Sequence, residues 1–148
     1  MASPALQLRF WGMVIIALTL GCSNDDSGLS RVDVSGVVHV NGEPLPQGHI
    51  SFKPQPGTPG PSVGAEVVQG SFQIPQDRGP SQGVQRVEIR ATRPTGRKLP
   101  EGSGSETPDR LVEETEQYVP EKYNRKSTLT ADLNAAKIEG LEFQLEIP

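Results

Sequence analysis

The feature that most constrains this chain is a series of short segments in which apolar and polar residues alternate. Alternation of this kind gives a strand one apolar face, because successive side chains of a strand point to opposite sides. Turn-forming residues separate the segments, among them Asn41-Gly42 and the four prolines within residues 54–62. The pattern predicts seven strands, at residues 32–40, 49–53, 63–68, 71–74, 86–92, 128–133 and 141–147.

Seven one-sided strands favour a fold in which two sheets cover each other's apolar faces. We therefore expect an all-β fold, a seven-stranded antiparallel β-sandwich over residues 31–148, with Gly36 relaxing the first strand or marking a bulge. Residues 94–118 are polar and rich in Gly, Ser and Glu, and we read them as a long mobile loop. Within that loop, residues 110–118 (RLVEETEQY) could form at most one or two turns of exposed helix.

An uninterrupted apolar run precedes these strands and leads to the only cysteine of the chain, Cys22. The run covers residues 10–20, which is the length of a signal-peptide core and is too short to span a bilayer. Gly21-Cys22 and then a polar stretch follow it. This arrangement resembles the lipobox of bacterial lipoproteins, with Thr19 where that family usually has Leu.

The lipobox resemblance implies cleavage between Gly21 and Cys22, a diacylglycerol on the Cys22 thiol and a further acyl chain such as palmitate on the new amine. Residues 1–21 would then be a lipoprotein signal peptide and residues 22–30 a flexible tether. Two or three acyl chains on one residue give stable attachment, so the protein would be exported and held on a bacterial membrane, at its periplasmic or outer-surface face, without a transmembrane helix. The alternative is a plain secretory signal or an uncleaved anchor.

A second resemblance is carried by five segments of the mature chain: 34–38 (VSGVV), 41–45 (NGEPL), 50–54 (ISFKP), 119–130 and 141–147. Together they resemble carboxypeptidase regulatory-like domains, which are transthyretin-like, Ig-like β-sandwiches that occur in short lipoproteins of planctomycete bacteria. The sequence departs from that family at Gln85, where the family often has Tyr. The resemblance implies a β-sandwich that acts as an accessory or structural module, and fold alone does not determine function.

Composition excludes several classes of function. The net charge is −4, and removal of residues 1–21, whose only charge is on Arg9, would leave −5, whereas nucleic-acid binding needs a basic face. One cysteine allows neither an internal disulfide nor a CxxC metal or redox motif. The chain also contains no GxSxG nucleophile elbow and no Gly-rich phosphate loop. We therefore expect no enzymatic activity and no cofactor.

Two groups of residues could be considered as metal ligands. His39 and His49 flank the first turn and could approach each other across a hairpin, but a site needs at least a third ligand. An acidic cluster could gather Ca²⁺, but it lacks the Asp/Asn/Gly spacing of calcium loops. We therefore expect no metal, with solvated histidines and a solvated acidic loop instead. The acidic cluster consists of Glu113, Glu114, Glu116 and Glu121.

Tyr118 and Tyr123 are the candidates for an interaction loop, although Tyr123 could instead pack on the edge of the sandwich while Asn124 turns the chain into the next strand. The hypothesis that the sequence favours is a lipid-anchored, non-enzymatic module of the cell envelope that binds an envelope protein or a glycan. An alternative is an accessory lipoprotein that binds carbohydrate or another small molecule, against which stands the scarcity of aromatic residues. A transthyretin-like hydrolase is the remote alternative.

Overall fold

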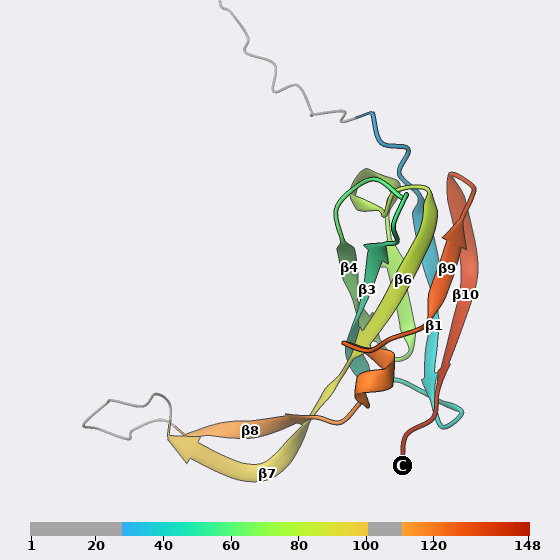
Figure 1. The fold of residues 1–148 in the computed structure, drawn as a ribbon. Coiled ribbons are helices and arrows are strands. Elements are labelled where there is room, and N and C mark those ends of the chain that lie inside the picture. The colour runs from blue at the N-terminus through green and yellow to red at the C-terminus, as the bar shows by residue number, and fades with distance from the viewer. Residues whose placement is uncertain (1–27, 101–110) are drawn as a thin grey trace, which may run out of the picture.

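The computed structural model describes residues 28–100 and 111–148. These residues form an all-β fold that resembles a sandwich, which confirms the predicted class (Figure 1). Within them, the only helical elements are two 3₁₀ turns, η1 (Gln76–Arg78) and η2 (Glu121–Tyr123). The strands are β1 (Asp33–Val40), β2 (Glu43–Pro44), β3 (Gln47–Pro54), β4 (Val63–Val68), β5 (Ser71–Ile74), β6 (Gly83–Arg90), β7 (Thr92–Pro100), β8 (Leu111–Gln117), β9 (Thr130–Leu133) and β10 (Lys137–Leu145).

The main sheet has the strand order β10-β1-β5-β4-β3-β6-β9, with β2 paired to β1, and it curls so that its two halves face each other. All seven predicted strands are present in it. Every neighbouring pair is antiparallel except β1 and β10, which are parallel, so the expectation of a wholly antiparallel sandwich was wrong in this one pairing. Residues 134–136 carry the chain from one edge of the sheet to the other, and β10 therefore enters beside β1 without a hairpin.

The core lies between the two halves of the curled sheet. Phe72 of β5 stands between Phe52 of β3 and Phe143 of β10, with ring centroids 6.0 and 6.3 Å away. The buried positions follow the predicted alternation, for example Val87, Ile89 and Ala91, which are all at most 3% exposed. Period-two burial therefore specifies which face of each strand packs inward.

Gly36 sits where two strands approach closely. The register between β1 and β10 shifts beside it, from Val34 paired with Ile138 to Gly36 paired with Leu141, so the predicted irregularity is confirmed. The extra residue belongs to β10, where Gly140 has a φ of +72°. A Cβ on Gly36 would lie 2.2 Å from the backbone oxygen of Leu141, so only glycine fits at this position.

The turn at Asn41-Gly42 joins β1 to β2 in a two-residue hairpin, with φ values of +52° and +86°. This conformation suits an Asn-Gly pair, because both central residues need a positive φ. The Asn41 amide also holds the end of the chain, since its Nδ2 donates to the Ile147 carbonyl (3.1 Å) and its Oδ1 accepts from the Ile147 amide (3.0 Å).

The predicted loop at 94–118 is corrected by the structure, because β7 and β8 form a separate two-stranded antiparallel ribbon that projects from the sandwich (Figure 1). The possible helix at 110–118 is likewise wrong in its described part. The polar composition hid the strands because their stabilising contacts are cross-strand ion pairs rather than apolar burial, as between Arg93 and Glu116 (2.8 Å). Residues 101–110 lie outside the described residues.

The described chain begins at one end of the sandwich and the ribbon leaves from the other (Figure 1). Backbone hydrogen bonds from Val32 to Pro80 and from Gln82 to Ser30 place the beginning beside the start of β6. The ribbon follows the end of β6, and an eight-residue strand spans roughly 25 Å. Among the residues described, no helix is long and apolar enough to cross a membrane.

Candidate functional site

The predicted lipidation site lies on residues that the structure does not describe. Gly21, Cys22, the signal segment 1–21 and the first part of the tether at 22–30 all lie outside the described residues. Cleavage and acylation therefore stay predictions. What the structure adds is the position at which the tether meets the sandwich, beside Ser81 at the start of β6, where Arg31 forms an isolated bridge.

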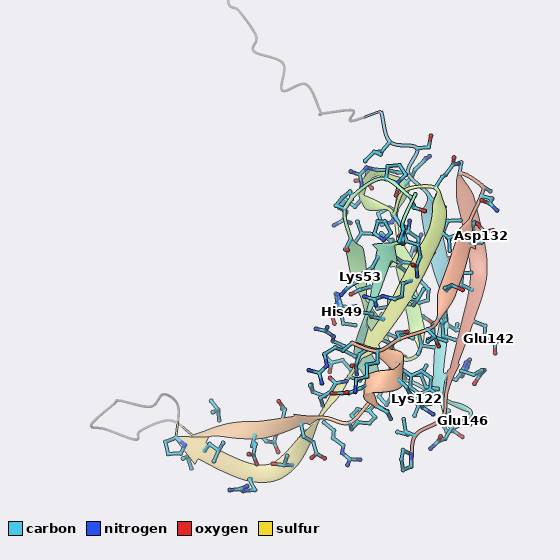
Figure 2. The ribbon with its side chains drawn as sticks, in the orientation of Figure 1. His49, Lys53, Lys122, Asp132, Glu142 and Glu146 are labelled. Carbon is cyan, nitrogen blue, oxygen red and sulfur yellow. The ribbon has the colours of Figure 1, made fainter. Side chains whose placement is uncertain are left out.

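His39 and His49 do not meet, because the hairpin after β1 pairs it with β2, and β5 and β4 separate it from β3. Each histidine faces a different carboxylate: His39 lies 3.9 Å from Glu142, and His49 lies 3.3 Å from Glu66. Glu142 and His49 lie on opposite sides of the sandwich in Figure 2. The part of the chain that the structure describes contains no group of three side chains able to hold a metal ion.

The acidic residues at 113–121 lie beside Arg and Lys side chains and do not converge on one point. Glu116 contacts Arg93, Glu114 lies 3.6 Å from Arg97, and Glu113 stands opposite Lys98 in the ribbon. Glu121 belongs to η2 and contacts Arg125 and Lys126. These carboxylates therefore support the ribbon and the η2 turn.

The two tyrosines have different roles. Tyr123 packs partly against the core, and its hydroxyl accepts a hydrogen bond from the Glu146 amide (2.9 Å), so it ties η2 to the end of the chain. Tyr118 follows the ribbon and lies under the Arg93 guanidinium, 5.4 Å from the ring centroid. Tyr118 lines a hollow in the surface.

Asn124 fixes the segment that crosses the end of β6. Its Nδ2 donates to the carbonyls of Val119 and Pro120, at 3.0 and 3.1 Å, and the residue is only 7% exposed. Ser127 then donates to the Val87 carbonyl at 2.5 Å, which fastens the segment to β6. The crossing segment brings Arg125 close to the outer face of the sheet, near Arg90.

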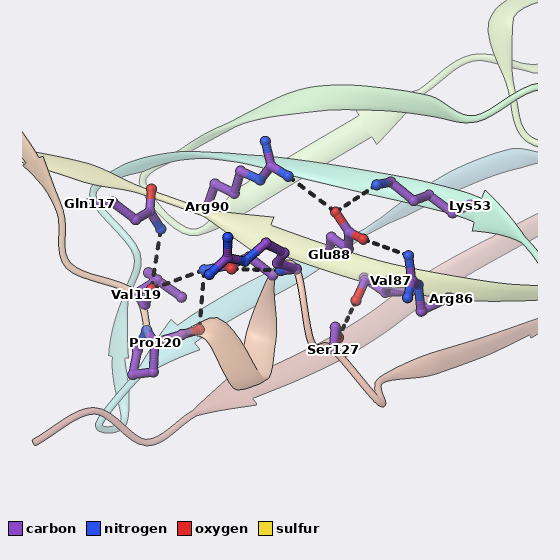
Figure 3. A network of polar contacts seen from close by, with 11 residues as sticks. Lys53, Arg86, Val87, Glu88, Arg90, Gln117, Val119, Pro120 and Ser127 are labelled. Carbon is purple, nitrogen blue, oxygen red and sulfur yellow. Dashed lines mark hydrogen bonds and ion pairs between the residues drawn. The ribbon is translucent and has the colours of Figure 1, made fainter.

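Glu88 is the most unusual residue on the polar face of β6. It is 2% exposed, although the alternation predicts that it points to solvent. Three cations surround its carboxylate: Lys53 Nζ at 2.8 Å, Arg86 at 2.8 Å and Arg90 at 3.4 Å (Figure 3). The two contacts of 2.8 Å are charge-assisted hydrogen bonds, which are stronger than hydrogen bonds between neutral groups, and they offset the cost of burying the charge.

Sequence reasoning missed this cluster, which we call the Glu88 cluster (Lys53, Arg86, Glu88 and Arg90). The signal present in the sequence was the Arg-x-Glu-x-Arg spacing of 86–90, which puts three charges on one face of a strand. Lys53 joins them only because β3 pairs with β6, and Arg86 stands directly opposite it. Burial of the carboxylate arises from its neighbours in space and has no sequence signature.

Two hollows flank the base of the ribbon and share Arg90 and Gln117. The larger, of about 590 Å³, is bounded by Tyr118, Pro120 and Arg125 together with these two residues. The smaller, of about 230 Å³, is lined on its other side by the residue pair His49 and Glu66. Cationic and amide side chains at the mouth of a hollow are suited to binding an anion.

We compared the chain with protein-family models, curated proteins and solved structures. No protein-family model matches the sequence, and no curated protein or solved structure is significantly similar to it. The function must therefore be argued from the residues of this chain.

Proposed function

We propose that the mature protein is a lipid-anchored, non-enzymatic module of the bacterial cell envelope that holds a binding surface away from its membrane. The lipobox-like sequence at Gly21-Cys22 supports the anchor. The proposed position of the binding surface rests on the separation of the two ends of β6. The tether meets the sandwich beside the start of β6, and the ribbon and both hollows lie at the end of β6.

The distances support this arrangement. A fully extended tether over residues 22–30 reaches about 30 Å. The β6 strand adds roughly 25 Å between the tether and the hollows. A binding surface at that distance clears the lipid headgroups and can meet envelope proteins or glycans.

The chemistry of the surface supports binding rather than catalysis. Arg90 and Arg125 at the larger hollow offer planar sets of donors of the kind that binds anions. Such groups position a ligand. The resemblance to carboxypeptidase regulatory-like domains supports the same accessory role.

The ribbon supports a protein partner as a second type of contact. Its outer end exposes apolar side chains, with Leu99 38%, Leu111 58% and Val112 40% exposed. An isolated two-stranded ribbon is only marginally stable in water. A partner that covers these side chains would stabilise the ribbon.

The anchor is tested by fractionating bacteria that express the full chain or its Cys22→Ala variant. We expect the wild-type protein in the membrane fraction, released by detergent but not by high salt, and the variant in the soluble fraction. Equal partition of the two proteins would contradict the proposal. Envelope crosslinking with Leu111→Ser and Val112→Ser then tests the ribbon, and crosslinks unchanged by both substitutions would exclude it as a contact.

A further inference from the structure

Positive charge is concentrated around the larger hollow of a chain whose net charge is −4. The Glu88 cluster has three cations and one carboxylate. Just after the η2 turn, Arg125 and Lys126 both contact the carboxylate of Glu121. The Glu88 cluster and the charged residues around Glu121 meet at the larger hollow. Arg90 lines it from the Glu88 cluster, and Glu121 and Arg125 line it from the other side.

The Arg90 guanidinium has N–H donors that Glu88 does not use. Lys53 and Arg86 each lie 2.8 Å from one oxygen of Glu88, so the carboxylate is satisfied without Arg90. Among the residues that the structure describes, Arg90 makes only the longer contact of 3.4 Å, and its side chain is 57% exposed. A guanidinium carries five N–H donors, most of which remain open here to a ligand.

Arg125 faces the same hollow with a side chain that is 69% exposed. Its partner Glu121 is also held by Lys126 at 2.7 Å, so Glu121 keeps a counter-ion if Arg125 turns to a ligand. Arg90 comes from β6 and Arg125 from the crossing segment. The Ser127 hydrogen bond to the Val87 carbonyl fixes this segment against β6, and the Asn124 hydrogen bond to the Val119 carbonyl holds the turn within the segment.

The walls of the hollow suit a sugar ring. Arg93 lies over the Tyr118 ring, and the part of Tyr118 that lines the hollow supplies, with Pro120, apolar surface for the C–H groups of a pyranose. Gln117 supplies an amide for the hydroxyl groups of the sugar. Gln117 uses its Nε2 to donate to the Val119 carbonyl at 3.3 Å. The volume of about 590 Å³ is within the range of small-ligand sites.

We infer that the larger hollow binds an acidic saccharide, with Arg90 and Arg125 holding a carboxylate or phosphate carried on a ring that packs against Tyr118. This inference rests on the proposed envelope-binding function and names the ligand class of that surface. The apolar surface of Tyr118 and Pro120 beside the Gln117 amide and the two arginines favours a sugar ring over the headgroups of a bilayer. The smaller hollow, with Glu66 beside His49, is the less suited of the two to an anion.

The experiment is a calorimetric titration of the detergent-solubilised protein purified from membranes. The ligands are a galacturonic acid trimer, the matching neutral galactose trimer and inorganic phosphate, with vesicles of anionic phospholipid in a separate arm. We expect the acidic trimer to bind at least about tenfold more tightly than the neutral trimer, and its binding to weaken severalfold as salt rises from about 50 to about 200 mM. Arg90→Gln and Arg125→Gln should each weaken it by about tenfold or more.

Arg78→Gln is the matched control, because Arg78 is a similarly exposed arginine in η1 and lines neither hollow. Arg90→Lys keeps the charge without the planar fork and should bind with intermediate affinity. Melting curves establish that each variant is folded.

Wild-type affinity in Arg90→Gln, or the same loss in Arg78→Gln, would overturn the inference. If the neutral trimer binds as tightly as the acidic trimer, the inferred contact between the arginines and an anion is wrong, whereas the proposed glycan-binding envelope module is not contradicted. Binding to anionic vesicles alone, to phosphate alone or to none of the probes would overturn the saccharide site. The fractionation of Cys22→Ala remains an independent test of the proposed function.

Discussion

Replacing Glu88 by glutamine removes one buried negative charge with almost no change in volume. The wild-type carboxylate is 2% exposed and receives two contacts of 2.8 Å, from Lys53 and Arg86, and one of 3.4 Å, from Arg90. A hydrogen bond to a charged group contributes about 1.5–3 kcal/mol, roughly twice the neutral value. Without the negative charge, the stabilising contribution of each of the two short contacts therefore falls by about 1 kcal/mol.

The cations in the cluster moderate this loss. The side chains of Lys53 and Arg86 are 36% exposed and that of Arg90 is 57% exposed, so all three can recover some hydration when the carboxylate is gone. We therefore expect Glu88→Gln to lower the free energy of unfolding by about 2 kcal/mol, below the 3–5 kcal/mol typical of a fully buried broken pair. Urea unfolding followed by circular dichroism measures this loss from the midpoint at unchanged slope.

Glu139→Gln is the matched control, because Glu139 contacts Lys137 at the same 2.8 Å with both side chains well exposed. Surface pairs of this kind contribute little, so we expect no measurable shift of its midpoint. Equal midpoints for the two variants would refute the argument that burial makes the Glu88 contacts strong.

Three further predictions concern the frame of the sandwich. Gly36→Ala should lower the free energy of unfolding by about 3 kcal/mol or prevent folding, because its Cβ would meet a β10 backbone oxygen at 2.2 Å; a urea midpoint like that of wild type would contradict this. Asn41→Gly keeps the positive φ but loses two hydrogen bonds to the chain end, so a loss of about 1 kcal/mol is expected, together with faster amide exchange at Ile147; unchanged exchange would show that the bonds do not hold that end. Lys137 donates a hydrogen bond to Glu139, and this bond, followed by the charge of Glu139, raises the pKa of Lys137 above 10.5. The contribution of this exposed pair to stability, too small to shift the urea midpoint, is complete below that pH and is lost as pH rises through the folded pKa. NMR titration should show a lower Lys137 pKa in Glu139→Gln, and an equal pKa would exclude this cause.

Local periodicity was enough to predict seven of the eight strands of the main sheet, all but the two-residue β2. Val87, Ile89 and Ala91 are buried as their spacing predicts, because burial on one face of a strand is a two-residue pattern that needs no knowledge of the partner strand. The parallel pairing of β1 with β10 could not be predicted in this way, since it joins segments at the two ends of the domain through the curl of the whole sheet.

The ribbon and the candidate site show the same limit. The strands β7 and β8 lack an apolar face, so the signal that reveals strands was absent, and charge pairing such as Arg93 with Glu116 replaced it. Tyr118 was found as a candidate by its residue type, whereas Arg90 and Arg125 were not. Their nearness depends on the crossing of residues 119–127 over the end of β6, which is a property of the folded chain.

The intact mass of the protein extracted from membranes shows directly whether Cys22 carries the lipid anchor that would hold the binding surface at a distance from the bilayer. We predict a chain that begins at Cys22 and carries the added mass of a diacylglycerol, with or without a further acyl chain. An unmodified chain that begins at any other residue would contradict the lipid anchor at Cys22.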